Sequence, residues 1–163
     1  MEDGTLKEAA PINAFHKAPG CIIGHGETMV LPDIATIGPF LVTADEIKDP
    51  QKMQVKLWVN GSLKQNFNTD DMAHNIKRCI EWMSAIHELE PGDILATGTN
   101  HRGLSSFQDG DKVELECEGL GKLVIGVRDD LKRTWSRETR LERTQRGLTG
   151  LTPQLTGKYS KPS

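Results

Sequence analysis

The segment from Leu89 to Thr99 carries the residue types with the clearest chemical potential. Glu90-Pro91-Gly92-Asp93 predicts a tight turn, because proline fixes φ and glycine tolerates a positive φ. The apolar residues 94–96 then predict a short strand that ends in Thr97-Gly98-Thr99. Backbone N–H groups and threonine hydroxyls at such a strand end could hold a carboxylate or an oxyanion without a cation. An ordinary strand end is the alternative interpretation of this pattern.

Two ionisable residues follow this segment. Arg102 could bind a second carboxylate through its forked guanidinium, and His101 could bind one or act as an acid or base. A pair of solvated loop side chains is the alternative. His74 and His87 fall on a predicted helix, where surface or core positions are more typical than ligand roles. The sequence contains no HExxH zinc pattern, nucleophile elbow, phosphate-binding loop or dinucleotide-binding glycine pattern.

Short strands are the elements that must position these residues. Residues 52–69 predict a hairpin, because Val55, Leu57 and Val59 alternate with other residues and Asn60-Gly61 favours a type I′ turn. The further strands predicted by alternation and turn signals lie within 21–32, in two pieces, and at 40–43, 93–97, 112–118 and 122–128, of which the last two form a second hairpin.

One long helix is predicted from Asp71 to His87, with Thr69 and Asp70 as N-cap candidates. Apolar residues recur along it at steps of three and four, which predicts that one face packs on the core. Many short strands with one packing helix predict a β-rich α+β fold in which antiparallel strands predominate.

Length and charge limit the classes of protein that fit. The 163 residues suffice for one domain, and no apolar run is long enough to span a membrane. The three cysteines are far apart, which indicates reduced thiols and a cytoplasmic protein. Residues 129–163 hold eight Lys or Arg and four Asp or Glu, so they contribute +4 and residues 1–128 contribute −7. We expect this basic extension to pack on the acidic body or on a partner subunit rather than on nucleic acid.

Several weak motifs follow one another along residues 15–128. They are Phe15-His-Lys-Ala-Pro-Gly20, Ile22-Ile-Gly24, Thr28-Met-Val-Leu-Pro32, Ile37-Gly-Pro-Phe-Leu-Val-Thr-Ala-Asp-Glu-Ile47, Leu57-Trp-Val-Asn-Gly61, Asn68-Thr-Asp-Asp-Met72, Leu89 to Thr99, Asp109-Gly-Asp-Lys-Val-Glu114 and Glu118-Gly-Leu-Gly121. Each motif is weak alone, but their order is specific. Together they resemble the catalytic C-terminal domain of the fumarylacetoacetate hydrolase family.

The resemblance implies a mixed β-rich (α+β) fold, a rolled mixed sheet with one main packing helix. It also implies a homodimer and a divalent metal, magnesium, manganese or calcium, in the active site. Family members cleave, decarboxylate or isomerise small keto or enol diacids, and a hard cation suits the enolate charge that develops in such reactions. By the same match Thr99 would grip a substrate carboxylate, Gly98 would allow close backbone approach, and Lys17 would steer charge.

The metal ligands that the resemblance implies are absent from the place where we expect them. Family members carry a Glu-x-Glu pair, a later aspartate segment and a lysine between the strands that end at Pro32 and begin near Ile37. Here only residues 33–36 separate these strands, so no metal ligand is assigned. Glu114 and Glu116 have the spacing of the pair, but they lie on a late hairpin, where a solvated face is typical.

Two explanations of this departure stay open. Either further residues of the parent protein belong between Pro32 and Ile37, or the chain lacks the segment. Loss of central strands would leave unpaired edges, which favours the first explanation. The sequence thus predicts a catalytic domain at 1–128, incomplete around 33–36, and a basic extension at 129–163.

Two functions follow from the resemblance. The first is a metal-dependent hydrolase, decarboxylase or isomerase acting on C–C bonds of small 2-keto or enol dicarboxylates. The alternative is a catalytically inactive, β-rich subunit or oligomerisation module of the same family. In either case we expect a small dicarboxylate or keto-acid ligand, a homodimer, and no nucleic acid or membrane as a partner.

Overall fold

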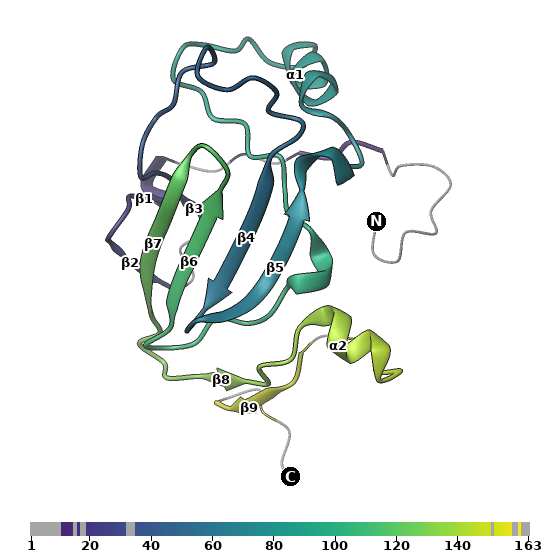
Figure 1. Cartoon of the computed structure of the whole chain (residues 1–163). Helices are drawn as coiled ribbons and strands as arrows, with labels where there is room; N and C mark the ends of the chain where they lie inside the picture. Colours follow the sequence, from purple (N-terminus) through teal and green to yellow (C-terminus); the bar gives the residue numbers. More distant parts are fainter. Residues whose placement is uncertain are drawn as a thin grey trace.

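A mixed five-stranded sheet forms the body of the computed structural model, which describes residues 11–14, 16, 19–31, 35–150, 152–157 and 160. Its strand order is β2-β7-β6-β4-β5 (Figure 1). Only the β2–β7 pair is parallel, and the other neighbours are antiparallel. The strands are β2 (Thr28–Val30), β4 (Gln54–Val59), β5 (Ser62–Asn68), β6 (Lys112–Cys117) and β7 (Gly121–Arg128).

Both predicted hairpins are confirmed. Strands β4 and β5 pair from Gln54 with Asn68 to Val59 with Ser62. Asn60 and Gly61, which join them, have φ values of 50° and 77°, as a type I′ turn requires. The Asn60 side chain also bonds to the neighbouring strand, because its Oδ1 accepts from the Lys112 amide at 2.9 Å. Strands β6 and β7 form the second hairpin.

The core lies on one face of this sheet. Alternate residues of β7 are buried while those between them are partly exposed, as expected for a strand with one solvated face. The buried cluster is formed by side chains from β2, β4, β6 and β7, namely Met29, Val59, Val113, Ile125 and Val127. The buried cluster therefore comes from four neighbouring strands, and partly buried Ile23, Leu31 and Phe107 from outside these strands pack against it.

Short elements surround the sheet. Strands β1 (Ile22–Ile23) and β3 (Ala35–Thr36) form a separate parallel pair. Because β1 and β2 both lie within residues 21–32, this stretch holds two strand pieces, as predicted. The remaining elements before β6 are η1 (Pro19–Cys21), η2 (Thr69–Asp71), α1 (Ile76–Ser84) and η3 (His101–Gly103).

Two predicted strands are not formed. Residues 40–43 and 93–97 have no regular secondary structure. The amides from Ile94 to Asn100 donate to no other backbone group in the described part of the chain. Ile94 is 62% exposed. A strand needs a neighbour to satisfy its backbone groups, and no described strand pairs with this segment.

The predicted helix is shorter than expected and packs differently. Its N-cap is Asn75, whose side chain accepts from the Arg78 amide at 2.8 Å. Thr69, a predicted cap, instead bonds through its hydroxyl to Met53 and Pro50. No α1 residue is buried, so the prediction that its apolar face packs on the core is wrong. Figure 1 shows why: α1 lies at one end of the sheet rather than against a face.

The basic extension packs on the same chain, at the opposite end of the sheet from α1 (Figure 1). It contains β8 (Thr134–Trp135), α2 (Arg140–Gln145) and β9 (Gln154–Thr156). Arg137 donates to the buried Asp111 at 2.7 Å, and Gln108 donates to the Trp135 carbonyl at 2.7 Å. Of the two predicted positions for the extension, the structure describes packing on the body.

The predicted fold class is confirmed: the structure is β-rich, with a mixed sheet and one main helix. None of the helices within the described residues has the length and apolar character needed to cross a membrane.

Candidate functional site

The loop from Gly98 to Arg102 leads into η3 and lies beside strand β5. The Thr99 side chain contacts the sheet directly: its Oγ1 donates to Oε1 of Gln65 at 2.7 Å. Gln65 sits on β5 and is only 9% exposed, whereas Thr99 is exposed. A nearly buried amide thus holds a hydroxyl at the protein surface, which fixes the direction in which that hydroxyl points.

Close backbone packing holds η3 against β5. A Cβ atom at Gly103 would overlap the carbonyl oxygen of Lys64 and the side chain of Gln65, so only glycine fits there. The Asn100 side chain caps the turn by accepting from the Arg102 amide at 3.0 Å. These contacts place the loop on the same strand that carries Gln65.

The C-terminal extension supports the loop from the other side. The amide of Arg140, at the start of α2, donates to the Leu104 carbonyl at 2.9 Å. Helix α2 itself is held by a capping box between Thr139 and Glu142. Its basic residue Arg143, whose side chain is largely buried, pairs with Glu138 at 3.3 Å. The loop is therefore supported by β5 and by α2.

Four of the five predicted site residues lie together in this loop. Gly98 has a φ of 86°, and the space where its Cβ would stand is open. Thr99, His101 and Arg102 follow it and are exposed. Lys17 lies outside the described residues, so its role stays a prediction.

Gln65 is the residue of this site that the sequence did not reveal. It occupies the polar return strand of the first hairpin, where a solvated side chain is the usual expectation. The one signal for it is positional: Gln65 pairs with Leu57 across the hairpin, so the two side chains share a face of the sheet. This pairing does not predict the contact with Thr99, because Thr99 belongs to a loop that is distant from Gln65 in sequence.

The described residues do not fit the hard divalent cation that the family resemblance implies. Within this part of the chain, no group of three or more His, Cys, Asp or Glu side chains could hold a metal ion. Glu114 and Glu116, which have the family's spacing, pair with Lys112 and Lys122 at 3.3 Å each. A hard cation needs several free oxygen ligands converging on one point, and these carboxylates do not supply them.

The two carboxylates that are buried among the described residues are also engaged by cationic partners. Hydrogen bonds from Arg133, at 2.9 Å, lower the pKa of Asp129 from its usual 3.8 to about 2. Burial raises the pKa of Asp111, but hydrogen bonds from Arg137, Asn60 and the Gln108 amide outweigh it and hold the pKa below its usual value. Both groups are thus ionised, structural carboxylates of the junction with the C-terminal extension.

The connection between the first strands is short. The 163-residue sequence is continuous, and only residues 31–34 separate β2 from β3. The printed sequence therefore holds no Glu-x-Glu pair or aspartate segment at this point, and both explanations of the departure stay predictions.

Comparisons with known proteins identify the family. Residues 30–128 match the family model described as fumarylacetoacetate (FAA) hydrolase C-terminal. Maleylpyruvate hydrolase of Aquipseudomonas alcaligenes is 40% identical over 98 residues, which are 60% of this chain and 34% of the relative. A 4-hydroxyphenylacetate degradation bifunctional isomerase/decarboxylase of Salmonella dublin is 40% identical over 91 residues, 56% of this chain and 21% of the relative.

Solved structures agree with these sequence matches. The crystal structure of maleylpyruvate hydrolase from Sphingobium sp. SYK-6 in complex with manganese(II) ion and pyruvate superposes with a TM-score of 0.56 at 38% identity. The match covers 58% of this chain and 35% of that one. The chain thus spans about a third or less of the length of these relatives. Because the family model matches more than half of its residues, this chain belongs to the fumarylacetoacetate hydrolase family.

Proposed function

We propose that this chain binds small 2-keto or enol dicarboxylates through the loop from Gly98 to Arg102. For the whole protein, the corresponding proposal is the family's chemistry: hydrolysis, decarboxylation or isomerisation at a C–C bond of such a compound. The loop lies within the residues that match the family model. One solved relative is a complex with pyruvate, a small 2-keto acid.

The contact between Thr99 and Gln65 carries this proposal. A carboxylate at the loop would accept the hydrogen that the Thr99 hydroxyl now donates to Gln65 at 2.7 Å. The Gln65 amide nitrogen offers two further donors beside it. The amides from Ile94 to Asn100, which donate to no other described backbone group, add main-chain donors to the same surface. Hydroxyl, amide and main-chain donors together suit an anionic, oxygen-rich ligand.

His101 and Arg102 extend the site toward a second anionic group. Both follow Thr99 directly and are exposed at η3. A guanidinium can hold a carboxylate with two parallel hydrogen bonds, which would favour a dicarboxylate over a monocarboxylate. The proposal concerns binding, and we assign no proton transfer to His101.

The described residues supply binding groups but no ligands for the family's metal. The catalytic proposal for the whole protein therefore includes a divalent cation (magnesium, manganese or calcium). Residues other than those described would have to supply its ligands. The structure of the related maleylpyruvate hydrolase in complex with manganese(II) ion supports such a metal in the family. From the described residues we derive no bond-breaking step.

The second candidate is a non-catalytic subunit or oligomerisation module of the family, which the absent ligand segment favours. Exposed apolar side chains of α1 and the following loop also favour it: Ile80 and Ile86 are 46% and 55% exposed. Such surfaces are typical of protein contacts. A homodimer, a cytoplasmic location and the absence of nucleic-acid or membrane partners remain proposals under both candidates.

Calorimetric titration with oxaloacetate and pyruvate, together with a turnover assay in Mn²⁺, tests both candidates. We expect saturable binding of oxaloacetate that is tighter than that of pyruvate, because only oxaloacetate can engage both Thr99 and Arg102. Metal-dependent turnover would support the catalytic candidate. Binding without turnover would support a binding subunit. Absence of binding to both keto acids would overturn the proposed ligand class and leave the oligomerisation module.

A further inference from the structure

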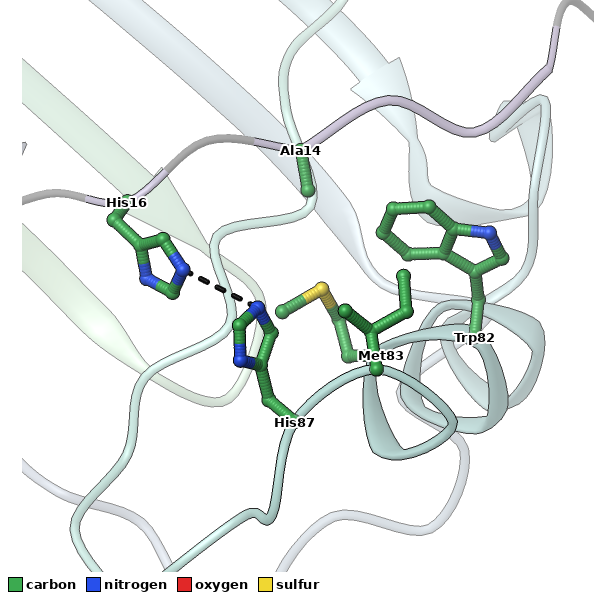
Figure 2. Close-up of a pocket in the computed structure, with 6 residues that line it drawn as sticks. Ala14, His16, Trp82, Met83 and His87 are labelled. Carbon is green, nitrogen blue, oxygen red and sulfur yellow. Dashed lines mark hydrogen bonds between the residues drawn. The ribbon is translucent and has the colours of Figure 1, made fainter.

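Two histidines meet at a pocket outside the site described above. His16 belongs to the N-terminal segment and His87 follows α1, yet their Nε2 atoms lie 3.2 Å apart. The ring centroids are 4.7 Å apart and the ring planes make an angle of 80°. Figure 2 shows the two rings pointing toward each other at the mouth of a pocket that Ala14, Trp82 and Met83 also line.

This separation matches the bite of two imidazoles on one metal ion. A tetrahedral zinc ion with Zn–N bonds of about 2.0–2.1 Å holds two nitrogens at a separation of roughly 3.3 Å. The observed distance of 3.2 Å between the two Nε2 atoms is close to that value. A hydrogen bond between the rings would need one Nε2 to carry a proton, whereas a metal would use the lone pairs of both nitrogens.

Both rings are placed so that a cation can reach them. His16 and His87 are exposed, and the pocket beside them has a volume of about 140 Å³. Among the described residues that line it there is no lysine or arginine, so none of these side chains repels an incoming cation. Solvent can complete the coordination, as it does wherever a protein supplies fewer ligands than the metal prefers.

We propose that His16 and His87 form a two-nitrogen site for a borderline divalent transition-metal ion, with Zn²⁺ as the representative cation. Imidazole suits zinc, copper and nickel, whereas carboxylate and water suit magnesium, calcium and manganese. The site is therefore distinct in chemistry from the oxygen-ligated metal that the family resemblance implies. It does not depend on the proposed function.

Metal binding here would tie the N-terminal segment to the end of α1. Helix α1 has no buried residue, so few contacts of the core hold it in place. A cation bridging His16 and His87 adds a link between two segments that are 71 residues apart in sequence. A metal ion that binds the folded chain and not the unfolded chain raises the free energy of unfolding as the metal concentration rises. The site would therefore have a structural role.

Isothermal titration of the EDTA-treated chain with ZnCl₂ tests this site directly. We expect saturable 1:1 binding, with Kd raised about tenfold or more in His16→Ala and in His87→Ala, the scale on which metal sites respond to altered ligand surroundings. His74→Ala is the matched control, since His74 lies near the other end of α1 and should leave Kd within about twofold. Mn²⁺ and Mg²⁺ should bind more weakly than Zn²⁺.

Trp82 provides a second readout, because it lines the same pocket. Saturating Cu²⁺ should quench tryptophan fluorescence in the parent chain, and most of that quenching should vanish in His87→Ala and in Trp82→Phe. His16→Gln and His87→Gln keep a polar side chain and guard against loss of folding in the alanine variants. Unchanged zinc affinity in all four variants of His16 and His87, or no zinc binding by the parent chain, would overturn the proposal.

Discussion

Replacing Thr99 with valine removes one hydroxyl and nearly conserves the shape of the side chain, so it isolates the hydrogen bond proposed for carboxylate binding. In the free chain the hydroxyl bonds to the neutral Gln65 amide at 2.7 Å, a contact worth about 0.5–1.5 kcal/mol. In the complex it would bond to a carboxylate, worth about 1.5–3 kcal/mol. The net loss of binding free energy is the difference, about 1 to 1.5 kcal/mol, or roughly a 5- to 13-fold rise in Kd.

Titration calorimetry with oxaloacetate measures this change directly. Thr156→Val is the matched control, because Thr156 also uses its hydroxyl in a side-chain bond, to Thr134 at 2.8 Å, but lies in β9. We expect the control to bind oxaloacetate as the parent chain does. An unchanged Kd in Thr99→Val, or an equal loss of affinity in both variants, would refute the assignment of the hydroxyl to the ligand.

Three further predictions concern the junctions that hold the site. Arg137→Gln removes a charge-assisted bond from the buried Asp111, so urea unfolding should show a loss of about 1–2 kcal/mol. The pKa of Asp129 is lower in the folded chain, about 2, than its usual 3.8. Its stabilising effect is therefore present above about pH 4 and disappears as the pH falls toward 2; acid unfolding of Asp129→Asn should lack this dependence, and identical profiles would contradict it. Gly103→Ala introduces an overlap with Lys64, so it should lower stability by about 1–3 kcal/mol and weaken oxaloacetate binding; unchanged values for both would contradict the packing described.

Local signals in the sequence were sufficient for the hairpins. Asn60-Gly61 specifies its own turn type, and alternation along the flanking residues specifies which side chains face the core. The capping box of Thr139 and Glu142 is another local signal, a threonine followed three residues later by glutamate. It could have predicted α2, which the sequence interpretation did not include.

Non-local requirements explain the errors. Residues 93–97 have the composition of a strand, but a strand forms only where a neighbour accepts its hydrogen bonds. The apolar stripe of α1 has the helical period, but a stripe is buried only where a sheet face lies opposite it. Both depend on which elements lie next to a segment in space, and local residue patterns do not specify that.

The candidate site was predicted in part. Thr99 and Gly98 follow from the residue types at the end of an apolar run, and the loop that holds them also contains His101 and Arg102. Gln65 was not predicted, because a single polar residue on a hairpin does not indicate which distant loop will contact it. Its role depends on the close approach of η3 to β5, which Gly103 permits.

Titration of oxaloacetate into the parent chain, once in EDTA and once in Mn²⁺, tests most directly whether this chain binds keto acids through its own loop. We predict the same saturable binding in both buffers, because the donors on the loop and on Gln65 need no cation. Binding that appears only in Mn²⁺ would contradict the account, since it would require metal ligands that the described residues do not provide.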